Sequence, residues 1–234
     1  MINGIYQGRL LDRLRGNDTR GHSFTGNNTV ESFTYRGSKT YNNMVYKFMI
    51  KGRTNTLNTP ANLFKWGLAE SNTCPCCGKA GTLHHKLNNC KPCMSTFTVR
   101  HNNIAKVIRE EIQKQYSYNC YKESSQISLQ ELMNNNEYQH ELRDENKRLK
   151  PDIHFLDTVT DTINIIEITC PYNQMTQVNN EFVNTLVHRQ ETKEMKYRSL
   201  KEETEVLTGM KTKLFTIVVS SLGHVTVKTK ENRY

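Results

Sequence analysis

The sequence has no long hydrophobic run and no internal repeat. Within its 234 residues no apolar stretch approaches the 18 or more residues of a membrane-spanning helix, and the polar N-terminus has no signal-peptide pattern. We therefore expect a soluble, intracellular-type protein without a membrane partner. A chain of this length can bury a substantial core, as one domain or as one domain with a small satellite.

Acidic residues are fewer than basic residues. The chain has 32 Lys and Arg against 23 Asp and Glu, a net charge of +9, which indicates a polyanionic partner, most often a nucleic acid. Residues 1–73 have 10 basic and 4 acidic side chains, residues 74–150 have 12 and 8, and residues 151–234 have 10 and 11. We expect phosphate binding upstream of residue 150. A merely basic surface is the plainer alternative.

Two short runs, residues 150–157 and 162–169, are rich in β-branched and aromatic residues and predict a β-hairpin that turns at residues 158–161. In that register Asp152 lies opposite Glu167, and opposed residues share a face with Cβ atoms about 5 Å apart. A divalent cation between the two carboxylates would explain the pair, because hard cations take oxygen ligands. The alternative is an ordinary hairpin with two solvent-facing acids.

The remaining patterns predict helices and strands around a small mixed sheet, an α/β chain. Residues 1–42, rich in Gly, Asn, Thr and Ser, predict a flexible basic segment. Thr59-Pro60 predicts the start of a helix, whereas residues 44–50 fit either a helix or a strand. The expected helices are 61–69, a helix after Cys93 with Ile104, Val107, Ile108 and Ile112 on one side, 137–148 and 180–207; the further expected strands are 213–220 and 224–228.

Five of the seven cysteines lie between residues 74 and 93, in the pattern of a structural zinc site. Disulfides are the weaker alternative in a reducing compartment. A four-ligand site leaves no open position, so the predicted role is structural. The spacing favours Cys74, Cys77, His85 and Cys90 as ligands, with Cys76 competing with Cys74, His84 with His85, and Cys93 with Cys90.

A nuclease of the Pro-Asp…(Asp/Glu)-x-Lys kind needs a lysine beside its carboxylates, yet the position two residues after Glu167 is Thr169. On the helix expected at 180–207, Lys193 lies at the centre of the apolar stripe, and Lys196 is about 60° away. A lysine in such a stripe either extends its ammonium to solvent at the edge of the apolar surface or is placed there for a function. Glu111 is a weaker candidate for a further carboxylate. The stripe around Lys193 contains Phe182, Leu186, Tyr197, Leu200 and Leu207.

In order and spacing, these segments resemble the C-terminal restriction-like endonuclease domain of non-LTR (LINE-type) retrotransposons, of the PD-(D/E)XK type with a CCHC zinc knuckle. That family often has Asp at the second carboxylate and has its lysine on the downstream helix. Residues 1–42 do not contribute to this resemblance. The segments that carry the resemblance are residues 50–66, the Cys-Cys-His-Cys pattern at 74–90, Arg100-His101-Asn102, Lys150-Pro151-Asp152 with an acid 15 residues later, Lys193-x-x-Lys196-Tyr197 and residues 218–223.

The resemblance implies a restriction-endonuclease-like core at residues 100–234, a mixed sheet flanked by helices, after a basic approach segment and zinc knuckle at 43–99. It implies Mg²⁺- or Mn²⁺-dependent nicking of double-stranded DNA in the nucleus, after synthesis in the cytoplasm, to prime reverse transcription. Element RNA and the reverse transcriptase portion of the same polyprotein are the implied partners. The alternative is a non-catalytic zinc-knuckle module that binds nucleic acid.

The expected residues fall into three sets. The first is catalytic, the second ligates zinc and the third contacts DNA. They are Asp152, Glu167, Lys193, Lys196 and Glu111 for catalysis, the first two as Mg²⁺ ligands; Cys74, Cys77, His85 and Cys90 for Zn²⁺; and Arg53, Lys65, Arg100, His101, Lys106 and Lys150 for DNA.

Overall fold

The computed structural model describes residues 43–116, 122–123, 129–130, 133 and 141–223. These residues divide into two compact units, one formed by residues 43–98, 170–188 and 219–223, the other by the described residues of 99–169 together with 189–218. No helix within the described ranges is long and apolar enough to cross a membrane. The flexible segment predicted at 1–42 and the strand predicted at 224–228 lie outside the described residues.

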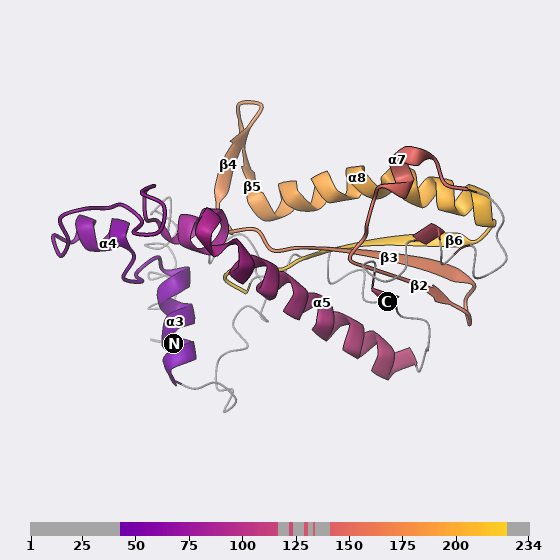
Figure 1. Ribbon diagram of the computed structural model, residues 1–234, viewed down its shortest axis with the longest axis horizontal. Coiled ribbons are helices and arrows are strands. Elements are labelled where there is room, and N and C mark those ends of the chain that lie inside the picture. Colours follow the sequence, from indigo (N-terminus) through magenta and orange to yellow (C-terminus); the bar gives the residue numbers. More distant parts are fainter. Residues whose placement is uncertain (1–42, 117–121, 124–128, 131–132, 134–140, 224–234) are drawn as a thin grey trace, which may run out of the picture. The chain divides into compact units, whose positions relative to one another are not determined.

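The second unit is built on a four-stranded mixed sheet with strand order β1-β2-β3-β6. The strands are β1 (Lys122–Glu123), β2 (Ile153–Asp157), β3 (Thr162–Thr169) and β6 (Lys211–Val218). Neighbours pair antiparallel except β3 and β6, which are parallel, and Figure 1 shows helix α8 (Thr185–Thr208) making the crossover between those two. The α/β chain with a small mixed sheet predicted from the sequence is confirmed.

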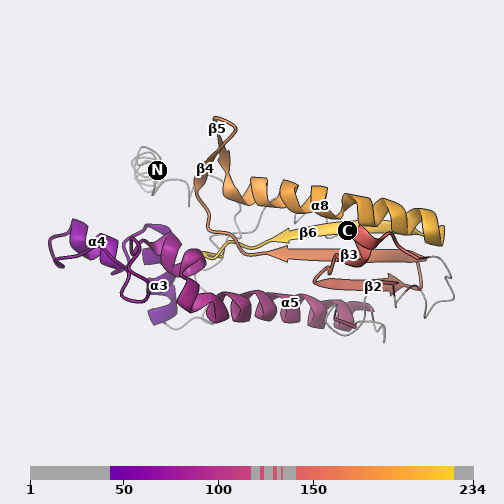
Figure 2. The same cartoon turned by 45° about the horizontal axis from the view of Figure 1, so that its top comes forward.

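Helices cover both faces of this sheet. Figure 2 shows β3 and β6 between α8 on one side and α5 (Met94–Tyr116) on the other. The β3 strand is therefore buried along its length, from Thr162 to Ile168, which explains why it reads as a nearly continuous apolar run. From α8, Tyr197 and Leu200 pack into a core with Ile163 and Ile165 of β3.

The predicted hairpin register is confirmed. Ile153 pairs with Ile166 and Asp157 pairs with Thr162, which leaves residues 158–161 as the turn. The Asp157 carboxylate closes that turn by accepting hydrogen bonds from the backbone N–H groups of Val159 (3.0 Å) and Thr160 (3.2 Å), an Asx-type turn.

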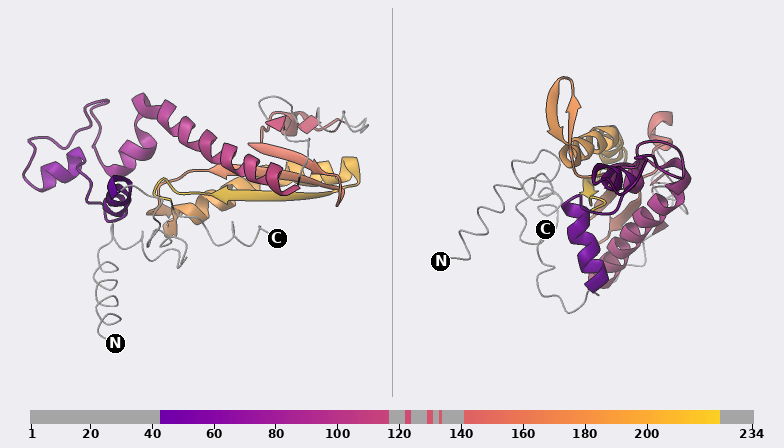
Figure 3. Two further views of the ribbon diagram at one scale, coloured as in Figure 1. Left: turned by 90° about the horizontal axis from the view of Figure 1, so that it is seen from below. Right: turned by 90° about the vertical axis from the view of Figure 1, so that its left-hand side faces the viewer.

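The helix predicted at 180–207 begins later, at Thr185. Residues 175–184 instead form a hairpin of β4 (Met175–Val178) and β5 (Glu181–Asn184), a two-stranded ribbon of its own in the first unit (Figure 3). Asn179 and Asn180 turn the chain with φ values of 49° and 66°, the left-handed conformation that two-residue hairpin turns require. Phe182 is therefore in a strand, 72% exposed, and is not part of a helical stripe.

A second helix is also shorter than predicted. Of the helix expected at 137–148, the described part contains only α7 (Asp144–Lys147), and residues 141–143 before it are not helical.

In the first unit, residues 44–50 are helical, within α3 (Asn43–Arg53). Helix α4 (Pro60–Lys65) begins where predicted, with the Thr59 hydroxyl accepting a hydrogen bond from the Asn62 N–H at 3.2 Å, an N-cap followed by proline. It ends at Lys65 and does not continue to residue 69. A π-helical turn (His85–Asn89) and a 3₁₀ turn (Lys91–Cys93) then lead into α5.

Candidate functional site

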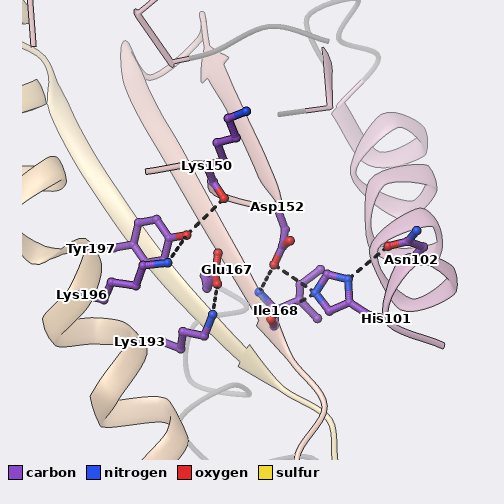
Figure 4. A network of polar contacts seen from close by, with 9 residues as sticks. All are labelled: His101, Asn102, Lys150, Asp152, Glu167, Ile168, Lys193, Lys196 and Tyr197. Carbon is purple, nitrogen blue, oxygen red and sulfur yellow. Dashed lines mark hydrogen bonds and ion pairs between the residues drawn. The ribbon is translucent and has the colours of Figure 1, made fainter. Parts of the chain in front are cut away.

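The two predicted carboxylates are brought together by neighbouring strands of the sheet (Figure 4). Asp152 immediately precedes β2 and Glu167 lies in β3, where Ile153 and Ile166 pair. The Ile168 N–H, one residue beyond Glu167, donates a hydrogen bond of 2.7 Å to Asp152 Oδ2. The end of the hairpin thus holds the Asp152 carboxylate against the strand that carries Glu167.

His101, on α5, is the cationic partner of Asp152. Its Nε2 lies 3.3 Å from Asp152 Oδ2 and 3.3 Å from the Ile168 carbonyl oxygen, and its Nδ1 lies 3.3 Å from Asn102 Oδ1. The hydrogen bond to Asp152 raises the pKa of His101 to about 9, although partial burial opposes the shift. His101 is therefore an imidazolium at neutral pH, and both of its N–H groups donate.

Glu167 is almost fully buried, with 3% of its surface exposed. Its Oε1 accepts an ion-paired hydrogen bond from the Lys193 ammonium of α8. Its Oε2 is also buried and forms no hydrogen bond of normal geometry within the described residues, although the Tyr197 hydroxyl lies close enough to the carboxylate to favour its charged form. Burial, followed by the negative charge of Asp152, raises the pKa of Glu167 even though the Lys193 ammonium opposes the shift. Glu167 thus retains a buried acceptor without a hydrogen bond of normal geometry, near a second carboxylate and the Tyr197 hydroxyl.

The two candidate lysines of α8 have different partners (Figure 4). Lys193 reaches Glu167, whereas the Lys196 ammonium lies 4.7 Å from the centre of the Tyr197 ring and 3.3 Å from its hydroxyl oxygen. The Tyr197 hydroxyl donates to the Lys150 carbonyl oxygen at 3.1 Å, and burial, with the nearby Glu167 charge, raises the pKa of Tyr197. Tyr197 therefore remains a neutral donor that ties α8 to the residues before β2.

The four ionic groups balance one another. His101 and Lys193 contribute two positive charges, and Asp152 and Glu167 contribute two negative ones, all within the second unit. Lys193 keeps 28% of its side chain exposed and Asp152 keeps 23%, against 4% for the Glu167 side chain. Asp152 and Lys193 are therefore the carboxylate and the ammonium of this site that solvent reaches, whereas Glu167 is shielded from it.

Glu111 is not brought to this site. Its side chain is 57% exposed and forms an ion pair of 2.7 Å with Lys114, and Val107, expected on the same apolar side, is 59% exposed. Within the part of the chain that the structure describes, the apolar side of α5 is not covered over its whole length. The prediction that Glu111 and Val107 lie on a covered side of the helix is therefore wrong. Ile104, Ile108 and Ile112 are half-buried.

The residues predicted to contact DNA differ in exposure. Arg53 is 4% exposed and its Nε donates to the Leu222 carbonyl oxygen at 3.2 Å, so it lies in the interior of the first unit and not on a DNA-facing surface. Lys65 and Lys150 are exposed, and Arg100 is half-buried. Lys106 is 63% exposed and lies 3.8 Å from Glu110.

A cysteine–histidine cluster lies in the first unit. The ligand atoms of Cys74, Cys77, His85 and Cys90 all lie within 4.8 Å of one another, with Cys77 Sγ 3.1 Å from His85 Nε2 and Cys74 Sγ 3.9 Å from Cys90 Sγ. A tetrahedral zinc ion with Zn–S bonds of about 2.3 Å needs ligand atoms roughly 3.5–4 Å apart. The cluster can hold a metal ion such as zinc, and it contains the four ligands that the spacing favoured.

His84 is engaged elsewhere. Its ring stacks on Tyr172 with centroids 5.0 Å apart, and its Nε2 lies 3.1 Å from Asn89 Nδ2. The neighbouring His85 is buried among the cysteines. Between the two adjacent histidines, the structure therefore favours His85 as the ligand.

The tie between His101 and Asp152 is a contact that the sequence reasoning missed. A signal for it is present in the sequence: at 100° per residue, His101 lies about 20° from Ile108 on α5. A histidine on the apolar side of a helix that precedes a Pro-Asp strand is placed to meet that aspartate.

No protein-family model matches the sequence, and a comparison with curated proteins found no match.

Proposed function

We propose that the protein is a divalent-metal-dependent DNA endonuclease that nicks one strand of a duplex. The observation that carries the proposal is the buried Glu167 carboxylate, which lies close to the Asp152 carboxylate and pairs with Lys193 through one oxygen. Its other oxygen, near the Tyr197 hydroxyl, forms no hydrogen bond of normal geometry within the described residues. A buried acceptor of this kind costs free energy unless a donor or a cation meets it. Two carboxylates offer the oxygen ligands that Mg²⁺ and Mn²⁺ take.

Each residue has a distinct part in the proposed chemistry. Asp152 and Glu167 would hold the cation, which when bound supplies a lowered pKa for water and neutralises charge on the scissile phosphate. Lys193, partly exposed beside Glu167, would hold the attacking water or a phosphate oxygen. His101 and the Ile168 N–H fix the orientation of Asp152, and Tyr197 fixes the backbone before it.

The charge of the site agrees with a phosphodiester substrate. Asp152, Glu167, Lys193 and His101 sum to zero, so a bound divalent cation gives the site a charge of about +2. Phosphoryl transfer concentrates negative charge on the reacting phosphate, and catalysis of it consists largely of positioning and electrostatic stabilisation. A site that becomes positive only with its metal would hold the reacting phosphate more tightly than the free carboxylates allow.

The wider role rests on the family resemblance of the sequence. The small mixed sheet between helices, the Cys/His cluster at residues 74–90 and exposed basic residues such as Lys65 are consistent with that family, whose nuclease would open chromosomal DNA for a non-LTR retrotransposon. The 3′-hydroxyl left by the nick would prime reverse transcription by the polymerase portion of the same polyprotein. The zinc ion would hold the fold of the knuckle and take no part in cleavage.

Nicking of supercoiled plasmid tests the proposal. The full chain should convert supercoiled to open-circular DNA with Mg²⁺, the activity should vanish with EDTA, and Asp152→Ala should abolish it while leaving DNA affinity in EDTA unchanged or higher. DNA binding without any metal-dependent nicking would instead favour a nucleic-acid-binding module, for which the exposed Lys65 and the Cys/His cluster are the supporting features.

A further inference from the structure

Two cysteines of the knuckle remain after the four favoured zinc ligands are assigned. Cys76 and Cys93 are both free thiols, Cys76 exposed and Cys93 half-buried. With Cys90 they form a second group whose three sulfur atoms all lie within 4.8 Å of one another. Cys90 therefore belongs to both groups, and it is fully buried between them, at 0% exposure.

The local backbone brings these three sulfurs together. Cys90 and Cys93 have the x2 spacing of metal-binding cysteine pairs, and the 3₁₀ turn Lys91–Cys93 brings the Cys93 N–H to 2.9 Å from the Cys90 carbonyl oxygen. Cys76 lies in the tight turn that the Gly78 N–H closes on the Cys74 carbonyl oxygen at 2.8 Å. Two separate turns thus present their thiols to one point.

A cation already stands next to this group. Lys86 Nζ lies 4.0 Å from Cys76 Sγ, so part of the negative charge of additional thiolates is neutralised by the protein. With two divalent cations, five thiolates and one neutral histidine, the cluster has a net charge of −1, the same as one cation with three thiolates and a histidine. A second ion therefore adds no net charge for the chain to accommodate.

We propose that Cys76, Cys90 and Cys93 form a second site for a thiophilic divalent cation, with Cys90 bridging it to the ion of the first site. Sulfur ligands select soft or borderline ions such as zinc and cadmium. Solvent would supply the fourth ligand, because Cys76 is exposed. The second ion ties the turn at residues 74–78 to the residues directly before α5, which the first site alone reaches only through Cys90.

Titration of the full chain with Cd²⁺ tests the proposal, with ion content measured by mass spectrometry and thiolate-to-metal charge-transfer absorbance after removal of bound zinc. Excess glutathione is added so that it removes Cd²⁺ bound only by isolated thiols. Wild type should retain two ions per chain, whereas Cys76→Ser and Cys93→Ser should each retain one. The control Cys170→Ser, a half-buried thiol outside both groups, should retain two.

Two results would overturn the second site. One is saturation of wild type at a single ion, which would make Cys76 and Cys93 bystanders or replacement ligands for one shared ion. The other is retention of two ions by Cys76→Ser, since that thiol is exposed and its loss leaves the fold intact. Under either outcome, Cys74, Cys77 and His85 remain among the ligands of the first ion.

Discussion

Lys193 and Glu167 are 26 residues apart in the sequence and lie on different elements, yet the Lys193 ammonium is ion-paired with the buried Glu167 carboxylate. The Lys193 ammonium neutralises the charge of the Glu167 carboxylate, which is buried in β3. It also places a positive charge on the same carboxylate that a divalent cation would bind. In the proposed metal site, the charge of Lys193 on α8 would therefore affect the affinity of the two carboxylates for a cation.

Lys193 and Lys196 should differ sharply in their effect on cleavage. Lys193→Met should lower the plasmid-nicking rate by about 100-fold or more, the scale for removal of a preorganised electrostatic group. Lys196→Met should cost less than about tenfold, because Lys196 contacts Tyr197 and not a carboxylate. Rates at saturating Mg²⁺ decide the comparison, and a dead Lys196→Met beside an active Lys193→Met would reverse the assignment.

Metal affinity without DNA should respond in the opposite sense. Lys193→Met removes a cation that competes for Glu167, so Mn²⁺ should bind more tightly, by roughly tenfold if one charge pair near the surface is lost. Calorimetry in the absence of DNA measures this, with Lys196→Met as the matched control. Weaker Mn²⁺ binding by Lys193→Met would mean that the lysine does not compete with the cation.

DNA affinity should depend on Lys65 and not directly on Arg53. Lys65 is exposed, whereas Arg53 is buried against the Leu222 carbonyl oxygen. Lys65→Ala should reduce the slope of log affinity against log salt by about 0.9, one phosphate contact, without changing the melting temperature. Arg53→Ala should lower the melting temperature. Equal salt slopes for wild type and Lys65→Ala would remove Lys65 from the DNA-binding surface.

The stability of the second unit should depend on pH through Glu203. Burial raises the pKa of Glu203, but hydrogen bonds from Asn146 and from the backbone and side chain of Arg143 outweigh it and the net pKa is lowered. The charged form is therefore stabilised by folding. That stability is present above the ordinary Glu range and is lost as the pH falls through the lowered pKa.

Glu203→Gln should accordingly lower the free energy of unfolding at pH 7 by about 1–2 kcal/mol, and the difference from wild type should shrink in acid. Urea unfolding at several pH values measures it. The exposed neighbour Glu202→Gln is the control and should be nearly neutral. The same pH profile for both variants would contradict a stabilising role of Glu203.

Local signals in the sequence were sufficient for the hairpin and the start of α4. The Asp157 turn, the β-branched strands and the Thr59-Pro60 cap are each decided by residues close in the chain. The register then brings Asp152 next to the strand of Glu167, so the carboxylate pair follows from the hairpin. The orientation of Lys193 toward the sheet could also be predicted, because Tyr197 and Leu200 on the same side of α8 are core residues.

Helical periodicity failed where none of the described residues covers the helix or where another element forms. Phe182 fits the apolar stripe of α8 by angle, but Asn179 and Asn180 adopt a left-handed turn and divert the chain into β5. Glu111 fits the stripe of α5, yet it is exposed beside Lys114. The spacing of apolar residues identifies one face of a helix, but tertiary packing decides which element, if any, covers this face.

The central claim is that Glu167 acts in metal-dependent cleavage, and one nicking assay tests it most directly. Wild type, Glu167→Gln and Glu111→Gln are compared on supercoiled plasmid at saturating Mg²⁺, with DNA affinity measured in EDTA. Glu167→Gln should lose about 100-fold or more of the nicking rate at unchanged affinity, since a metal ligand is removed, and Glu111→Gln should stay within about twofold of wild type. Cleavage by Glu167→Gln at the wild-type rate would contradict the endonuclease assignment.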